Sequence, residues 1–125
     1  MEFFPVFMDL GGRDCLVVGG GTVAARKLGL LLRAGASVEV VAPQLCEKLV
    51  ALRDAGKIRH SARAFEAADV EGKALVIAAT SREAVNRSVS ELAKARNIPV
   101  NVVDQPELCS FIVPSIIDRS PVQVA

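Results

Sequence analysis

Residues 15–24 form the run CLVVGGGTVA, in which a short apolar stretch meets three consecutive glycines. A helical pattern follows directly, so the run predicts a strand, a tight turn and the start of a helix. The spacing Gly19-x-Gly21-x-x-Ala24 matches the dinucleotide-binding fingerprint in its alanine-ended form.

Each small residue of this fingerprint has a physical task. Gly19 takes a backbone conformation that a side chain would forbid, and Gly21 lets a pyrophosphate approach the main chain. Ala24 lets the helix lie close to the strand. The free N–H groups at the helix start and the helix dipole favour an anion there. Because the motif lies between a strand and a helix, we favour a dinucleotide site over an ordinary glycine turn.

The composition predicts a single domain. The chain has 125 residues, 51% of them hydrophobic, and a net charge of +1, which gives no indication of nucleic acid or an acidic membrane as partner. Cys15, Cys46 and Cys109 show no metal-ligand spacing and are expected to be small buried hydrophobes in a reducing compartment. No apolar run is long enough to span a membrane, and the start lacks the basic residues of a signal peptide, so a cytoplasmic location is predicted.

The rest of the chain alternates strands and helices, which predicts a Rossmann-like, doubly wound parallel sheet. Strands are expected at about 15–18, 37–41, 58–61, 74–79 and 99–103, with helices at about 22–34, 45–56 and 81–97. Val23, Leu30 and Leu31 are expected to form the apolar face of the first helix. The segment 80–83 resembles a capping box at the start of the third helix.

The two ends of the chain are less regular. Phe3, Phe4, Val6 and Phe7 are expected to form an extended segment packed against the domain, with anchoring of a sheet edge or binding of a partner as alternatives. Residues 111–125 are broken by prolines and predict β-structure that turns back along the sheet edge. The chain stops inside an expected strand, which indicates an N-terminal fragment of a longer protein.

Three turns are expected to meet where the strand order reverses, because ligands of such sheets bind at the carboxyl ends of the strands. They are residues 19–23, 42–44 and 80–81, and Asp104 ends the next strand at the same crevice. The second turn, Ala42-Pro43-Gln44, lacks the acidic residue that commonly holds the ribose of NAD. Gln44 or main-chain groups must then bind the ribose. The sequence of this turn does not distinguish an NAD site from an NADP site.

Asp104 has two interpretations. It is either the N-cap of a following helix or a carboxylate at a strand end that accepts a proton. The chain has no tyrosine, which excludes a Tyr-x-x-x-Lys dehydrogenase, and its one histidine, His60, lies on a strand away from the crevice. Asp104 is therefore the best acid–base candidate if hydride chemistry occurs here, and no bound metal is expected. Five basic residues either attract an anionic substrate or are solvated: Arg26, Lys27, Arg82, Arg87 and Arg119.

Several segments together resemble one family. They are FPVF at 4–7, residues 15–27, AAT at 78–80, NVVD at 101–104 and SFIVPSIIDRSP at 110–121. The chain resembles the N-terminal NAD-binding domain of siroheme synthase, the precorrin-2 dehydrogenase and sirohydrochlorin ferrochelatase. The glycine motif is common to many families, whereas NVVD followed by SFIVPS is far more specific.

The resemblance implies two reactions at one crevice. Precorrin-2 loses a hydride to NAD and a proton to a base, which gives sirohydrochlorin, and ferrous iron is then inserted as a substrate. Asp104 matches the proposed base of both steps, and Thr22-Val23 and Pro43-Gln44 match the NAD contacts. The predicted cofactor site consists of Gly19, Gly21, Thr22, Val23, Pro43, Gln44 and Thr80.

The resemblance also implies a domain plan. Residues 1–113 form the NAD-binding domain, and residues 114–125 begin a dimerisation segment that a uroporphyrinogen III methyltransferase domain follows in longer members. A homodimer is implied, and part of the active site is completed across it. The first alternative is a non-catalytic NAD-binding regulatory domain, but such domains usually keep an acidic residue where this chain has Ala42-Pro43. A small-substrate dehydrogenase is a third possibility.

Overall fold

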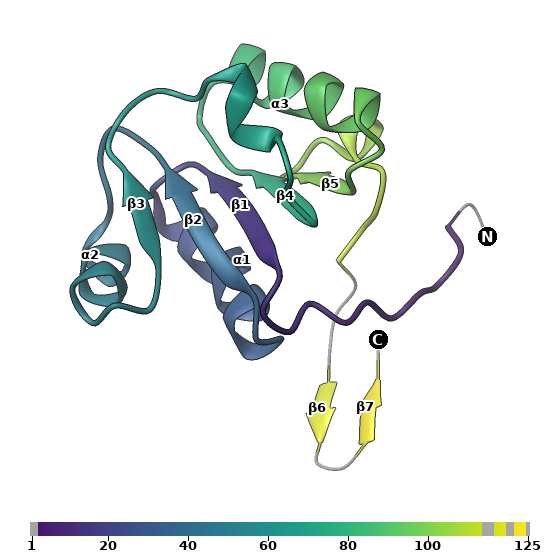
Figure 1. Ribbon diagram of the computed structural model, residues 1–125. Helices are drawn as coiled ribbons and strands as arrows, with labels where there is room; N and C mark the ends of the chain where they lie inside the picture. The colour runs from purple at the N-terminus through teal and green to yellow at the C-terminus, as the bar shows by residue number, and fades with distance from the viewer. Residues whose placement is uncertain (1–2, 114–116, 120–121, 125) are drawn as a thin grey trace.

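The computed structural model describes residues 3–113, 117–119 and 122–124, and its centre is a five-stranded parallel sheet (Figure 1). The elements are β1 (Asp14–Val18), α1 (Thr22–Arg33), β2 (Ser37–Val41), α2 (Glu47–Asp54), β3 (Arg59–Ser61), η1 (Ala67–Val70), β4 (Leu75–Ala78), α3 (Glu83–Ala95), β5 (Val100–Val102), η2 (Pro106–Leu108), β6 (Ile117–Arg119) and β7 (Val122–Val124). The strand order β3-β2-β1-β4-β5 reverses direction between β1 and β4. This confirms the predicted doubly wound fold.

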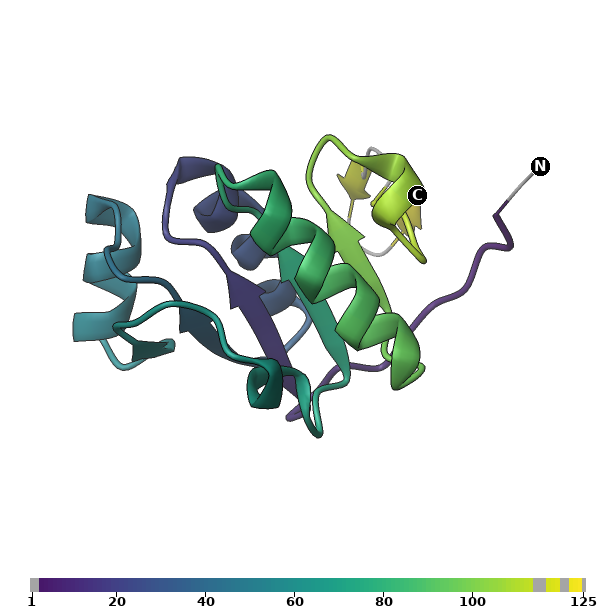
Figure 2. The same cartoon turned by 90° about the horizontal axis from the view of Figure 1, so that it is seen from above.

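The sheet separates two hydrophobic cores. Successive side chains of a strand point to opposite faces, so Cys15 and Val17 pack with α1 and α2, whereas Leu16 and Val18 pack with α3, η1 and η2. Figures 1 and 2 show α1 and α3 on opposite sides of the sheet. Because both faces of β4 and of β1 after Asp14 are covered, these stretches are apolar throughout, which is the signal that located them.

The buried face of α1 differs from the predicted one. Leu31 is buried as expected, but Val23 and Leu30 are only half-buried. The residues that pack on the sheet with Leu31 are Ala24, Ala25 and Leu28. The prediction followed the large apolar residues, whereas two adjacent alanines allow the helix axis to approach the strands closely.

The predicted capping box at residues 80–83 is wrong. α3 begins at Glu83, and its N-cap residue, Arg82, makes no side-chain cap. The Thr80 hydroxyl instead accepts a hydrogen bond from the Arg82 N–H at 3.1 Å and donates one to Asn86 Oδ1 at 2.7 Å. Thr80 therefore shapes the loop before the helix rather than the helix end.

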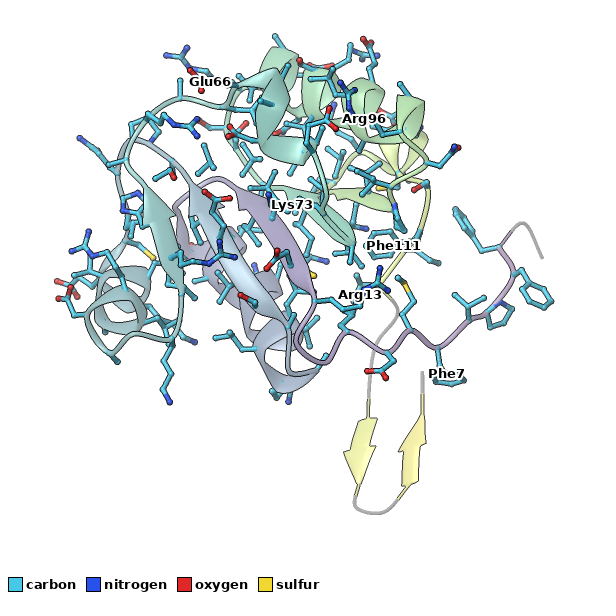
Figure 3. All side chains as sticks on the ribbon, viewed as in Figure 1. Phe7, Arg13, Glu66, Lys73, Arg96 and Phe111 are labelled. Carbon is cyan, nitrogen blue, oxygen red and sulfur yellow. The ribbon has the colours of Figure 1, made fainter. Side chains whose placement is uncertain are left out.

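The N-terminal segment does not pack in the core, so this prediction is wrong. Phe4 is 88% exposed, Phe7 85% and Val6 66%. Figure 3 shows Phe7 on the extended segment, away from the sheet. Leu10 is the first residue of the segment to enter the core.

The C-terminal β-structure is present, but it lies elsewhere than predicted. β6 and β7 pair antiparallel with each other in a two-stranded sheet of their own and do not extend the five-stranded sheet. The parts of this prediction that concern residues 114–116, 120–121 and 125 lie outside the described residues. The division at residue 113 remains a prediction.

Candidate functional site

A cleft of about 1090 Å³ opens at the carboxyl ends of the strands, at the point where the strand order reverses. We call it the glycine cleft. Its lining includes all eight residues predicted from the sequence: Gly19, Gly21, Thr22, Val23, Pro43, Gln44, Thr80 and Asp104. The structure thus brings these residues together, while their individual roles remain predictions.

Two of the three glycines fix the turns of this cleft. Gly19 has a φ of +126°, and a Cβ atom there would collide with the Ala79 carbonyl. A Cβ on Gly20 would collide with the Gln44 carbonyl oxygen, and the Gly20 oxygen accepts a hydrogen bond from Cys46 N at 2.8 Å. Gly20 was not among the predicted residues, because its constraint comes from a distant loop.

Gly21 has a different environment. No atom lies within 4 Å of the position that a Cβ would take, and its backbone is extended. Gly21 is also the N-cap of α1, and no side chain caps this helix end. Open space beside uncapped N–H groups suits a phosphate, so the residues present fit a dinucleotide at this position.

Asn86 fixes the third turn of the glycine cleft. Its Oδ1 accepts hydrogen bonds from Thr80 N at 3.1 Å and from the Thr80 hydroxyl, and its Nδ2 donates to Thr80 O at 3.0 Å. Asn86 is buried on α3 and was not predicted as a site residue. The only available signal was a polar side chain on the buried face of the expected helix.

The loop of residues 62–66 forms a further wall through Ala64 and Phe65. Arg63 binds Asp69 with two hydrogen bonds of 2.7 and 2.9 Å, and the Glu66 N–H donates to Asp69 Oδ2 at 2.8 Å. The Arg63 guanidinium and the Glu66 N–H hold the pKa of the Asp69 carboxyl below its ordinary value, although partial burial opposes this. The ion pair between Arg63 and Asp69 therefore connects the loop to η1.

Asp104 lies in a tight turn directly after β5. Gln105 N donates to Val102 O at 3.3 Å, and Val103 N donates to Ala78 O at 3.1 Å. Asp104 is exposed and has a φ of +62°, a conformation that is uncommon outside glycine and that concentrates at functional sites. The N-cap of η2 is Gln105, so the interpretation of Asp104 as a helix cap is wrong.

Cys109 stabilises this turn through hydrogen bonds of its thiol group. Its Sγ accepts a hydrogen bond from Val102 N at 3.1 Å and donates to Val102 O at 3.3 Å. Cys15 is fully buried, and burial raises the pKa of its thiol, as expected for a small hydrophobe in the core. Cys46 and Cys109 are only half-buried, so the prediction for these two is wrong.

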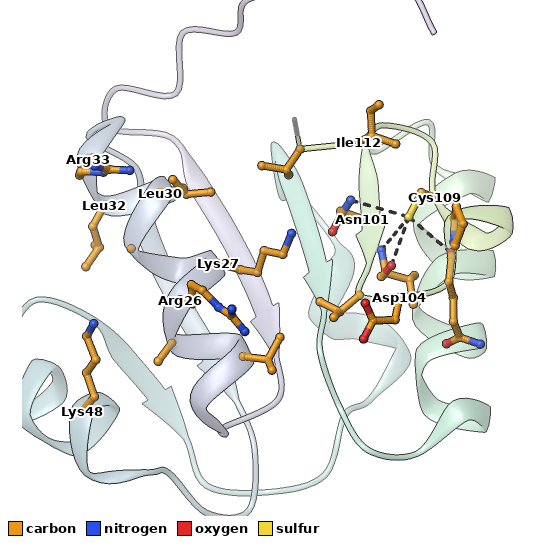
Figure 4. A pocket seen from close by; sticks show the side chains of 18 of the residues that line it. Arg26, Lys27, Leu30, Leu32, Arg33, Lys48, Asn101, Asp104, Cys109 and Ile112 are labelled. Carbon is orange, nitrogen blue, oxygen red and sulfur yellow. Dashed lines mark hydrogen bonds between the residues drawn. The ribbon is translucent and has the colours of Figure 1, made fainter. Parts of the chain in front are cut away.

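A second cleft, of about 950 Å³, separates α1 from β5 and η2 (Figure 4). We call it the basic cleft. The two clefts share three lining residues: Val23, Val103 and Asp104. Asp104 therefore lies at the junction of the two clefts.

The five basic residues noted in the sequence separate in the structure. Arg26 and Lys27 line the basic cleft, whereas Arg82 lines the glycine cleft. Arg87 forms an exposed ion pair within α3. The side chain of Arg119 lies outside what the structure describes.

His60 supports the cleft indirectly. It lies on β3, at the edge of the sheet, and its Nε2 is 2.8 Å from the carbonyl oxygen of Ala42. Ala42 precedes Pro43 and Gln44 in the turn after β2. His60 therefore steadies a turn of the site without lining either cleft.

The described residues contain no group of three or more His, Cys, Asp or Glu side chains that could hold a metal ion. Over the same residues, no helix has both the length and the apolar character needed to cross a membrane.

The strand order, the glycine turn and the cleft at the switch point together define a dinucleotide-binding domain. The chain belongs to the family described as putative NAD(P)-binding, which matches residues 6–115.

Named relatives make the comparison more specific. The chain is 63% identical over all its 125 residues to the siroheme synthase of Thioalkalivibrio sulfidiphilus and 61% identical to that of Methylobacillus flagellatus. It spans 26% and 27% of these proteins, about a quarter of their length. The fold is similar to the solved structure of SirC, a precorrin-2 dehydrogenase, with a TM-score of 0.84 and 28% identity over 98% of this chain and 60% of that one. The resemblance to siroheme synthase indicated by the sequence is confirmed.

Proposed function

We propose that this chain is the part of a siroheme synthase that oxidises precorrin-2 to sirohydrochlorin with NAD. The observation that carries the proposal is the position of Asp104 at the junction of the two clefts. The identity to siroheme synthases and the likeness to a precorrin-2 dehydrogenase support it. NAD, when bound in the glycine cleft, supplies the hydride acceptor.

The residues of the chain perform the remaining tasks. The open space at Gly21 and the uncapped start of α1 receive the pyrophosphate. Thr22, Val23, Pro43, Gln44 and Thr80, which line the same cleft, would contact the rest of the dinucleotide. Asp104 accepts the proton that leaves the macrocycle as the hydride departs, so its exposed carboxylate acts as a general base.

The same site serves a second step in this proposal. Ferrous iron is a substrate that enters sirohydrochlorin as two pyrrole nitrogens lose their protons. Asp104, which is exposed, accepts these protons one at a time and passes each to solvent before the next. We also propose that the protein works as a homodimer in the cytoplasm. The exposed aromatic residues Phe4 and Phe7 support the dimer, and three free cysteines suit a reducing compartment.

The test replaces Asp104 with Asn in the full-length protein that contains this chain. Asn tolerates a positive φ as Asp does, so the fold is retained while the proton acceptor is lost. Precorrin-2 oxidation, followed by NADH absorbance, should slow by roughly 100-fold or more, as is typical for loss of a general base. Iron insertion, followed by the siroheme spectrum, should slow as well, while NAD affinity stays unchanged.

Glu107→Gln is the matched control, because Glu107 is a nearby exposed acid that lines neither cleft. Equal turnover in wild type and Asp104→Asn would refute the role of this carboxylate. A wild-type protein that binds NAD but leaves precorrin-2 unchanged would instead support a regulatory nucleotide-binding domain.

A further inference from the structure

β5 lies at one edge of the five-stranded sheet, so no strand of that sheet pairs with its outer side. Pro99 O and Val103 N pair with β4, and the alternate residues Val100 and Val102 therefore face outward. The segment after η2 returns along this edge. Ser110 N donates to Val100 O at 2.8 Å, and the Ser110 hydroxyl oxygen accepts from Val100 N at 2.9 Å. This segment thus takes the place of a further strand.

Cys109 makes the corresponding contacts at Val102, the last residue of β5. Its Sγ accepts a hydrogen bond from Val102 N at 3.1 Å, and its thiol can donate to Val102 O at 3.3 Å or to Gln105 O at 3.5 Å. Asn101 Nδ2 lies 3.7 Å from the same sulfur atom (Figure 4). One side chain therefore contacts both outward backbone groups of a buried residue, where a lost partner is costly.

The backbone next to Cys109 is anchored on α3. Leu108 is buried, and its carbonyl oxygen accepts a hydrogen bond from the buried hydroxyl of Ser90. The thiol of Cys109 thus joins the end of β5 to a segment that is fixed from the other side. This contact closes the turn of residues 103–108, which carries Asp104.

The position of Asp104 depends on this closure. Its side chain is exposed, so packing does not hold it, and its φ of +62° is a conformation that persists where surrounding contacts enforce it. Val102 and Cys109, at the two ends of the turn, supply such contacts. A displacement of about 1 Å is enough to slow a reaction that depends on the alignment of its groups.

We infer that Cys109 is a positioning residue, which holds the proton acceptor Asp104 in place by hydrogen bonds to both backbone groups of Val102. This inference rests on the proposed function and adds to it a residue that acts on the reaction through Asp104. The thiol neither ionises nor reacts in this role. It serves as a neutral donor and acceptor.

The experiment measures precorrin-2 oxidation by the full-length protein that contains this chain, followed by NADH absorbance. Cys109→Ala should lower kcat by about tenfold or more, because the carboxylate is no longer aligned. The KM for precorrin-2 and the affinity for NAD should change little, since the loss concerns proton transfer and Cys109 does not line the glycine cleft. Cys109→Ser should recover most of the lost rate, because a hydroxyl also donates and accepts.

A double-mutant cycle separates positioning from a general structural role. In the Asp104→Asn background, Cys109→Ala should change kcat by less than about twofold, because the group that Cys109 positions is already lost. Cys15→Ala is the matched control, since Cys15 is buried and lines neither cleft. It should lower the unfolding temperature, as removal of a buried group does, but leave kcat unchanged.

Cys109→Val fills a similar space without the hydrogen bonds, so it repeats the test if Cys109→Ala does not fold. A valine variant with the kcat of the wild type would overturn the inference. A loss by the same factor in the wild-type and Asp104→Asn backgrounds would also overturn it. In both cases the proposed function stands if Asp104→Asn alone slows oxidation. A wild type that binds NAD but does not oxidise precorrin-2 would refute the proposed function and, with it, this inference.

Discussion

Gly20 and Gly21 are neighbours with different constraints. A methyl group on Gly20 would collide with the Gln44 carbonyl, whereas one on Gly21 would enter empty space at the cleft. Gly20 is thus needed for the contact between two turns. Gly21 is needed only if a ligand comes close to the main chain.

This difference predicts opposite effects of two alanine substitutions. Gly21→Ala should leave the unfolding temperature almost unchanged, because its extended backbone suits any residue, but should raise the KM for NAD about tenfold or more by blocking the pyrophosphate. Gly20→Ala should lower both stability and NAD affinity, with a loss of about 1–3 kcal/mol that is typical of overpacking.

Thermal unfolding and coenzyme titration of the two variants check this prediction. Gly29→Ala on α1 is a suitable control, because a Cβ there meets no atom within 4 Å and the position is absent from the glycine cleft. Unchanged NAD affinity in Gly21→Ala would argue against a dinucleotide at this turn.

The predictable site residues are those with a local signal. Gly19, Gly21 and Thr22 belong to one motif between a strand and a helix, so their shared location followed from the sequence. Gly20 and Asn86 were missed, because their partners, Gln44 and Thr80, become neighbours only after the chain has folded.

At the scale of elements, the ion pair between Arg63 and Asp69 fixes the loop that carries Phe65 to the edge of the glycine cleft. The pKa of Asp69 is lower in the folded protein than its ordinary value of 3.8. The charged Asp69 carboxylate therefore contributes its full stabilisation of the fold at pH values above the pKa that this carboxyl has in the unfolded chain. This stabilisation is lost as the pH falls through the lower pKa that the Asp69 carboxyl has in the folded protein.

Asp69→Asn should remove this acid-dependent contribution. The unfolding temperature of the wild type should fall more steeply than that of the variant as the pH falls below the ordinary value of 3.8, because there the carboxyl of the unfolded chain takes up a proton while the folded one, paired with Arg63, is still charged. Asp54→Asn is the control, since Asp54 forms an ion pair with Arg53 that is exposed to solvent and contributes little. Parallel acid profiles for wild type and Asp69→Asn would contradict the prediction.

The elements themselves were predictable, and the helix caps were not. The apolar runs of β1 and β4 are local features that the sequence shows directly. Whether Thr80 or Asp104 caps a helix depends on competing partners. The Thr80 hydroxyl donates a hydrogen bond to Asn86 instead of capping α3. The turn after β5 places Asp104 one residue before Gln105, which is the N-cap of η2.

At the scale of the whole molecule, the N-terminal segment presents apolar side chains to solvent. Phe4, Val6 and Phe7 are mostly exposed, although burial of such residues is normally favourable. The sequence predicted that they pack in the core. That prediction rested on the apolar character of the segment alone, whereas in the structure α1, α2 and α3 cover both faces of the five-stranded sheet without it.

If these residues contact a second copy of the chain, Phe4→Ser/Phe7→Ser should weaken the dimer of the full-length protein. Light scattering across a dilution series should show dissociation at a protein concentration about tenfold or more above that of the wild type, since two buried aromatic side chains contribute several kcal/mol. The unfolding temperature of the monomer should stay constant, because neither side chain joins a core. Equal dissociation of wild type and variant would exclude this segment from the interface.

Val103 and Asp104 belong to one short turn, and that turn borders both clefts. A ligand in either space would therefore change the surroundings of the other, and we expect the two binding free energies to be linked. If the proposed function is correct, any factor by which bound coenzyme raises the affinity for the macrocycle is, by reciprocity, the factor by which the macrocycle raises the affinity for the coenzyme.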